Sequence, residues 1–193
     1  NTTASDNTAV GYQAGYTGVT AAGVTAIGST ALYTNTAGFT TAVGYQALNA
    51  NTSGTFNDAF GSSTLQVNTT GGSNSAFGRA SLTANTTGAS NVGIGAISLY
   101  SNTTGSFNSA LGNGALFSNI TASYNTAVGY QAGYTNQTGS LNTFIGRNAG
   151  YTSNYNGNAA NTCVGHSAGY SLTTGYYNTF IGGTDSGYYV TSG

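Results

Sequence analysis

Large apolar, small and polar residues recur in a fixed order along the whole chain. The clearest marker is a glycine that follows an apolar residue and returns every 17 residues, apart from one spacing of 16 and one of 19. Such regularity predicts a tandem repeat, and a repeat decides the architecture before any local signal. The marker glycines are Gly11, Gly28, Gly44, Gly61, Gly78, Gly95, Gly112, Gly129, Gly146, Gly165 and Gly182.

The residue before each marker glycine is large and apolar, and the residue before that is mostly alanine. Adjacent residues of a strand face opposite sides, so this order predicts a strand with one bulky face and one face that another part of the chain approaches closely. We interpret the bulky column as the structural core. It consists of Val10, Ile27, Val43, Phe60, Phe77, Ile94, Leu111, Val128, Ile145, Val164 and Ile181.

A third column lies four residues after the marker glycine. It is leucine in repeats two to seven and glycine in Gly15, Gly133, Gly150 and Gly169. Phe144 and Cys163 replace the usual alanine in repeats that carry Gly150 and Gly169, which indicates compensation of volume inside a coil. Gly15 and Gly133 accompany ordinary alanines, so this correlation is partial.

A unit of 17 residues is too short for a pair of helices or a propeller blade. It fits one coil of a β-solenoid, with two short strands and with turns at the glycines and at segments such as Asn85–Gly88. Coils stack ~4.8 Å apart, so about eleven of them make a rod roughly 50 Å long. We predict an all-β, parallel β-solenoid with residues 1–193 as a single array. Neither end has an evident cap, so we expect it to be part of a longer fibre.

Composition supports a stacked fold and narrows the function. Charged residues make up 3% of the chain, which suits ladders in which like charges would repel. A net charge of −1 gives no attraction for nucleic acid. No apolar run approaches the ~20 residues that span a bilayer, so membrane insertion is not expected. One cysteine cannot form an intrachain disulfide.

The repeat cores at Asn7–Gly11 and Asn125–Gly129 resemble the Asn-Ser-Val-Ala-Ile-Gly motif of trimeric autotransporter adhesin heads, which are parallel β-rolls of three chains. The whole unit Asn125–Gly139, NTAVGYQAGYTNQTG, is more similar to repeats of phage tail-fibre-like and bacterial surface proteins. The resemblance covers nearly the whole chain. It implies an extracellular, cell-surface or virion fibre that associates with itself, as a homotrimer or head to tail.

Candidate chemistry is sparse. Asp6, Asp58 and Asp185 fall in repeats far apart, whereas paired-carboxylate catalysis needs two carboxyl groups within ~5–10 Å. Arg79, Arg147 and His166 follow marker glycines in a variable column that we expect to be exposed. Cys163 belongs to the small column and is expected to be a buried, inert thiol. We therefore predict no enzyme, no catalytic residues, no metal site and no cofactor.

Acceptor sequons for N-glycosylation form a regular row. They lie at Asn1, Asn51, Asn68, Asn85, Asn102, Asn119 and Asn136, the last six one repeat apart. Either these residues are turn formers, or one edge of the rod carries a glycan on each coil. The second interpretation predicts a mass above that of the bare chain.

Two further columns suggest alternatives to a purely structural fibre. Tyrosines after the third column, such as Tyr134 and Tyr151, are candidates either for rings packed along the rod or for an adhesin face that recognises host glycans. Threonines three residues before the marker suggest ice binding, although Asp58, Ser75, Val92 and Ser109 interrupt that column. The favoured hypothesis is a rod or spacer of an extracellular or virion fibre.

Overall fold

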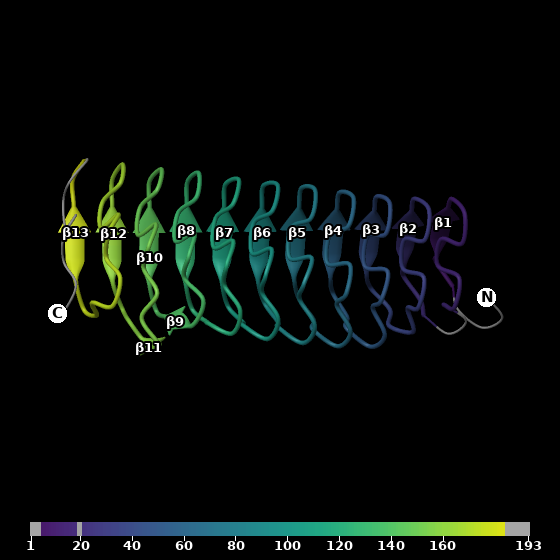
Figure 1. Ribbon diagram of the computed structural model, residues 1–193. Coiled ribbons are helices and arrows are strands. Elements are labelled where there is room, and N and C mark those ends of the chain that lie inside the picture. The colour runs from purple at the N-terminus through teal and green to yellow at the C-terminus, as the bar shows by residue number, and fades with distance from the viewer. Residues whose placement is uncertain (1–4, 19–20, 184–193) are drawn as a thin grey trace.

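The computed structural model describes residues 5–18 and 21–183 as one continuous stack of coils (Figure 1). No helix occurs in these ranges, and eleven strands form a single parallel sheet in which each strand pairs with that of the next coil. The predicted all-β, parallel β-solenoid is confirmed. Its strands are β1 (Thr8–Val10), β2 (Thr25–Ile27), β3 (Thr41–Val43), β4 (Asp58–Phe60), β5 (Ser75–Phe77), β6 (Val92–Ile94), β7 (Ser109–Leu111), β8 (Thr126–Val128), β10 (Thr143–Ile145), β12 (Thr162–Val164) and β13 (Thr179–Ile181).

Matching positions of successive repeats lie directly over one another. Val43 pairs with Phe60, and Ala42 pairs with Ala59. The same register holds across the 19-residue repeat, where Phe144 pairs with Cys163. The sheet therefore repeats the sequence columns as ladders of side chains.

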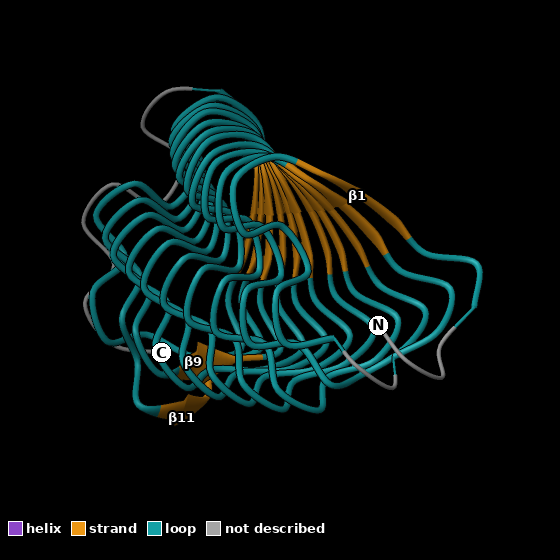
Figure 2. Ribbon diagram, turned by 90° about the vertical axis from the view of Figure 1, so that its right-hand side faces the viewer, coloured by secondary structure: helices purple, strands orange, loops and turns teal. Residues whose placement is uncertain are grey.

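Most coils contain one strand rather than the two that the sequence predicted. The strands form one side of the coil, and turns form the others (Figure 2). Turns prevail because several residues in each coil have positive φ, for example Phe56 at 57°, Ser63 at 57° and Leu65 at 50°, and such residues cannot continue a strand. A second, two-stranded sheet pairs β9 (Gly139–Ser140) with β11 (Gly157–Asn158) near the 19-residue repeat.

Backbone hydrogen bonds nevertheless join neighbouring coils on all sides. In one coil, Leu65 N–H donates to Ser81 and Thr69 N–H donates to Thr86, both in the following coil, at 3.0 and 2.9 Å. Gly61 N–H donates to Val43 and Ser73 N–H donates to Thr55, both in the preceding coil, at 2.8 and 2.9 Å. Irregular turns thus satisfy their polar groups as a sheet does.

The core lies on the opposite side of the strand from the one that the sequence analysis assigned. The alanine column faces inward and, together with the leucine column, forms the core. Ala59 and Leu65 have 0% exposure, whereas Ala9 and Phe180 in the outermost coils are not buried. A narrow coil has room for one large side chain, and leucine supplies it, so the strand residue that faces it must be small. The column predicted as core instead points outward and is nowhere buried. It comprises Val10, Ile27, Val43, Phe60, Phe77, Ile94, Leu111, Val128, Ile145, Val164 and Ile181.

The predicted volume compensation is confirmed and extends further than the sequence indicated. Phe144 is fully buried, and a Cβ atom added to Gly150 would collide with its ring. A Cβ added to Gly133, one coil earlier, would lie 2.5 Å from Phe144 Cδ2. One phenylalanine thus fills the space left by two glycines, which explains why Gly133 accompanies an ordinary alanine.

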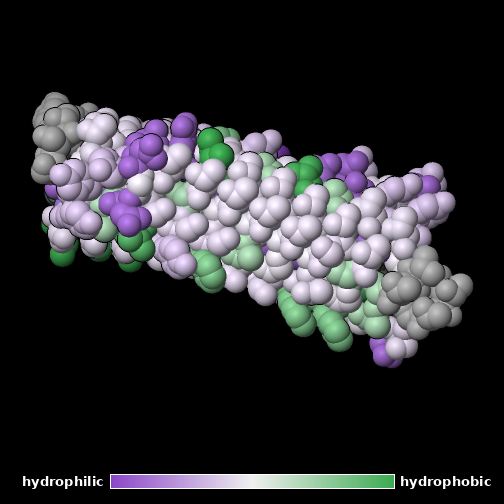
Figure 3. Space-filling model, turned by 90° about the horizontal axis from the view of Figure 1, so that it is seen from below, coloured by the Kyte–Doolittle hydropathy of each residue, from purple (hydrophilic) through white to green (hydrophobic). Residues whose placement is uncertain are grey.

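The marker glycines allow the coils to approach closely where the strands end. Gly78 has φ of 125°, and a Cβ there would lie 2.7 Å from the carbonyl carbon of Gly95. The surface around this stack is weakly polar, and strongly hydrophilic residues are few on the face seen in Figure 3. Among the residues that the structure describes, no helix is long and apolar enough to cross a membrane.

Candidate functional site

Asparagine side chains form a hydrogen-bonded ladder through the interior at the Asn-x-Ser/Thr turns. From Asn51 onward, each side-chain nitrogen donates to the side-chain oxygen one coil earlier, as Asn85 does to Asn68 at 2.7 Å and Asn102 does to Asn85 at 2.7 Å. The same nitrogen also donates to a carbonyl three residues ahead, as Asn85 does to Gly88 at 2.9 Å. We call this the turn ladder; its members are Asn35, Asn51, Asn68, Asn85, Asn102, Asn119 and Asn136.

The turn ladder overturns the idea of a glycan on each coil. An N-linked sugar replaces one hydrogen of the asparagine Nδ2, but in the ladder both hydrogens are used and the residue is completely buried. Attachment would break two hydrogen bonds and require space that the packed interior lacks. The correction applies to Asn51, Asn68, Asn85, Asn102, Asn119 and Asn136, whereas Asn1 lies outside the described residues.

A second asparagine ladder runs beside the strands and was not singled out from the sequence. Asn74 N–H and Nδ2 both donate to Asn57 Oδ1, at 3.0 and 3.1 Å, and Asn74 Nδ2 also reaches the carbonyl of Gly88. An asparagine four residues before nearly every marker glycine was the available signal. This strand ladder consists of Asn57, Asn74, Asn91, Asn108, Asn125, Asn142, Asn161 and Asn178.

The turn ladder ends where Ser153 takes the place of asparagine. Asn136 Oδ1 is buried and has no hydrogen-bond partner, and the hydroxyl oxygen of the buried Ser153 also has none. A serine is too short to supply the donor that asparagine supplies elsewhere in the column. Buried polar atoms without partners destabilise a fold, so this end of the ladder is a local weak point.

Aromatic rings stack along another side of the rod. Successive centroids from Tyr100 to Tyr170 lie 4.9–5.2 Å apart, with interplanar angles of 3–7°. Each ring covers the face of its neighbour, which leaves mainly edges and hydroxyl groups for solvent. Burial, together with the neighbouring tyrosines, raises the pKa of the Tyr151 hydroxyl. This ring ladder comprises Tyr100, Phe117, Tyr134, Tyr151 and Tyr170.

The first and third residues of each strand in the eleven-stranded sheet point away from the core, and we call their side chains the outer strand face. Threonines stack in register in the first three strands, beginning with Thr8 and Thr25, and again from Thr126 to Thr179. Between them, β4–β7 carry Asp58, Ser75, Val92 and Ser109 at the same position. The apolar column stands beside this row along the whole sheet.

The titratable residues are scattered over the rod. Asp6 and Asp58 lie three coils apart, roughly 14 Å at a ~4.8 Å rise. Arg79, Arg147 and His166 are exposed as expected, and Arg147 Nη1 contacts His166 Nε2 at 2.9 Å. Asp185 lies outside the described residues. No group of three or more histidine, cysteine, aspartate or glutamate residues within the described ranges is arranged to hold a metal ion.

Cys163 is completely buried in the alanine column, as the sequence predicted. Burial raises the pKa of its thiol from 9.0 to about 12. Because the thiolate is the nucleophilic form, this thiol is unreactive while the chain is folded.

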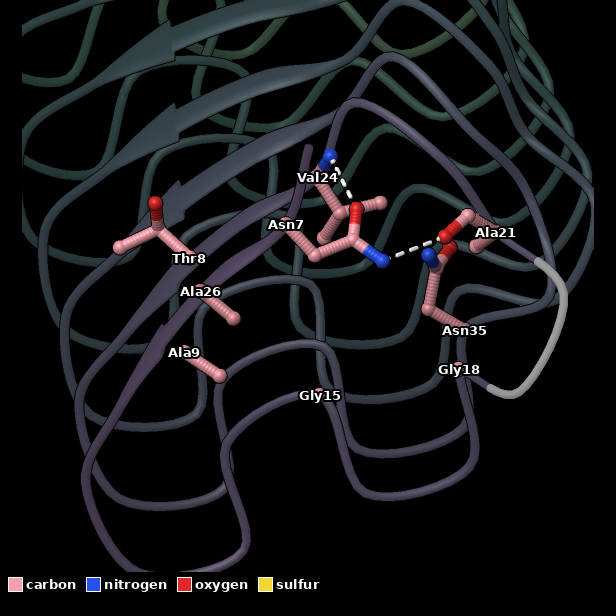
Figure 4. A pocket seen from close by; sticks show the side chains of 9 residues that line it. All are labelled: Asn7, Thr8, Ala9, Gly15, Gly18, Ala21, Val24, Ala26 and Asn35. Atoms are coloured by element: carbon pink, nitrogen blue, oxygen red, sulfur yellow. Dashed lines mark hydrogen bonds between the residues drawn. The ribbon is translucent and has the colours of Figure 1, made fainter. Parts of the chain in front are cut away.

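A small cavity of about 80 Å³ opens between the first two coils (Figure 4). It arises because Gly15 and Gly18 stand where later coils have leucine and asparagine. Asn7 spans it by donating to Ala21 O at 2.6 Å and accepting from Val24 N–H at 2.8 Å. Its walls are methyl groups, amides and backbone, so we interpret it as a gap in packing.

Comparisons with protein-family models, curated proteins and solved structures found nothing that matches this chain.

Proposed function

We propose that the chain is a structural segment of an extracellular or virion fibre, in which it acts as a rigid rod and spacer. The observation that carries the proposal is the set of continuous hydrogen-bond ladders, one through the turns and one beside the strands, that run from coil to coil inside the rod. Bending or opening the rod must break these bonds together with the backbone bonds around them.

Such ladders suit a mechanical role. A buried amide that loses its partner loses about 1–3 kcal/mol, so each coil resists separation from the next. In a solenoid each repeat contacts its neighbours alone, and stability therefore accumulates along the axis. Length, stiffness and resistance to proteases are the properties that a spacer requires.

Localisation on intact source material tests the proposal. Antibodies raised against the 193-residue chain should decorate filaments or tail structures on unlysed cells or particles. Labelling that appears only after lysis would contradict a fibre role, and antibody from pre-immune serum serves as the control.

Recognition of host glycans is the alternative with the least structural support. Sugars stack on the faces of aromatic rings, and in the ring ladder neighbouring rings occupy these faces. A glycan array probed with the isolated chain separates the two functions, since specific binding would favour an adhesin.

Ice binding has one observation in its favour, the outward threonine rows at both ends of the sheet. Hydroxyl and methyl groups repeat in register along these rows, but the exposed Phe60 and Phe77 lie between the two rows. A thermal-hysteresis measurement decides this candidate, and no hysteresis removes it.

A further inference from the structure

The exposed apolar side chains are concentrated on one side of the rod. Most of the large hydrophobic residues that are exposed belong to the outer strand face or to the position two residues before each strand. An exposed apolar surface of more than a few hundred Å² is uncommon in monomeric proteins and marks an interaction site. These residues are Val10, Ile27, Phe39, Phe56, Phe60, Phe77, Val92, Ile94, Phe107, Leu111, Tyr124, Leu141, Ile145, Tyr177 and Ile181.

The apolar column of the outer strand face is unbroken from β1 to β13. Its members stack one per coil, and the rings of Phe60 and Phe77 lie 4.8 Å apart with an interplanar angle of 5°. Stacked pairs also form two residues before the strands, where Phe39 lies 5.6 Å from Phe56 and Phe107 lies 5.0 Å from Tyr124. The result is a long ridge with the repeat of the coils.

Electrostatics does not oppose association through this face. Asp58 is the single charged residue at the first or third position of the eleven strands. The remaining side chains there are threonine, serine or apolar, so two such faces can meet without burying a row of like charges.

We propose that the outer strand face is the interface through which two copies of this chain pack side by side. A partner must present ridges and grooves at the same rise per coil in order to interdigitate along the rod. A second copy meets this condition because its coils have the same spacing. Paired sheets with ladders of identical side chains form dry, closely packed interfaces of this kind. The inference rests on the proposed fibre function, and it names the surface through which neighbouring chains of the fibre would be held together.

The size of the face is adequate. A strip about 50 Å long and 10 Å wide covers on the order of 500 Å² before the flanking aromatic pairs are added. Standard stable interfaces bury about 800 Å² on each partner. The strip alone therefore supplies more than half of that area, and the flanking aromatic pairs add to it.

Sedimentation velocity of the chain over the micromolar range tests the proposal. We expect a dimer or higher oligomer that dissociates at least tenfold more readily in the variant Phe60→Thr/Phe77→Thr/Leu111→Thr. Threonine keeps the strand preference of these sites and removes the apolar ridge. The matched control is Tyr100→Thr/Tyr134→Thr/Tyr151→Thr in the ring ladder, where Thr83 already occupies the same column.

The control variant should associate as the unchanged chain does, and circular dichroism must show that both variants remain folded. A chain that stays monomeric throughout the range, or two variants that dissociate equally, overturns the interface. Thermal hysteresis by a monomer would assign the face to ice instead. Small-angle X-ray scattering on the same samples distinguishes failure of the interface from failure of the spacer role. A rod-shaped monomer would contradict the interface but would remain consistent with a rigid spacer.

Discussion

The side-chain nitrogen of Asn85 donates a hydrogen bond of 2.7 Å to the side-chain oxygen of Asn68, one coil earlier. Asn102 donates in the same way to Asn85, so every inner member of the turn ladder is both donor and acceptor. Hydrogen bonds in such a chain polarise one another in a low-dielectric interior. The stability of the rod is therefore expected to depend strongly on its inner asparagines.

Replacing Asn85 by alanine should lower the free energy of unfolding by about 2–4 kcal/mol. The change removes the bonds to Asn68 and Gly88 and leaves the Nδ2 donor of Asn102 without its acceptor. Urea denaturation followed by circular dichroism measures the loss.

Thr87→Ala is the matched control, because Thr87 is exposed and its loss destroys the same sequon without touching the ladder. Its stability should change by less than about 0.5 kcal/mol. If both substitutions lowered the free energy of unfolding equally, the loss would come from the sequon and not from the ladder.

The periodicity of the sequence was sufficient to predict the solenoid, its register and the compensation of side-chain volume at Phe144. All three follow once the residues that occupy equivalent positions in successive repeats are known. It did not reveal which side of the strand faces inward. Val43 and Ala42 are both apolar, and only the closed coil shows that leucines such as Leu48 occupy the interior. The sequons misled for a related reason, because asparagine suits an exposed turn and a buried ladder equally well. Alternation of residues along a strand identifies its two faces, but the volume enclosed by the coil decides which of them is buried.

Gly150→Leu should be strongly destabilising although leucine is the commonest residue in its column. The new side chain would occupy the space of Phe144, and overfilling a packed core costs about 1–3 kcal/mol or more. Adding Phe144→Ala restores the pattern of the leucine-bearing coils. A double-mutant cycle by urea denaturation should give a coupling energy of at least about 1 kcal/mol in favour of the pair.

Gly15→Leu provides the contrast for this cycle. A Cβ at Gly15 lies at ordinary distances of 3.8 and 3.9 Å from the Cβ atoms of Ala9 and Ala26, and leucines elsewhere adopt the same positive φ. We expect this substitution to be tolerated or slightly stabilising. Similar large losses at Gly15 and Gly150 would exclude Phe144 as the cause.

Ser153→Asn should extend the turn ladder by one member. The new amide would supply the donor that Asn136 Oδ1 lacks, which should raise the free energy of unfolding by about 0.5–1.5 kcal/mol. Ser153→Ala is the control, since it removes the unpaired hydroxyl without adding a donor. If both variants are equally stable, the added donor contributes nothing, and the unpaired Asn136 Oδ1 does not lower the stability of the rod.

Cys163 should make the stability of the rod sensitive to alkaline pH. The thiol has a pKa of about 12 when folded against 9.0 as the ordinary value, so folding favours the protonated form. Its contribution is complete below pH 9 and declines as pH rises toward 12, with a slope of up to about 1.4 kcal/mol per pH unit for one proton.

Unfolding by urea at pH 8, 9, 10 and 11, compared between the unchanged chain and Cys163→Ala, isolates the contribution of the thiol because the tyrosines are common to both. The stability difference between the two chains should stay constant up to pH 9 and then shift in favour of the alanine variant. A difference that is the same at pH 8 and pH 11 would mean that the thiol ionises as easily in the folded coil as in the unfolded chain, contrary to its burial against Gly169.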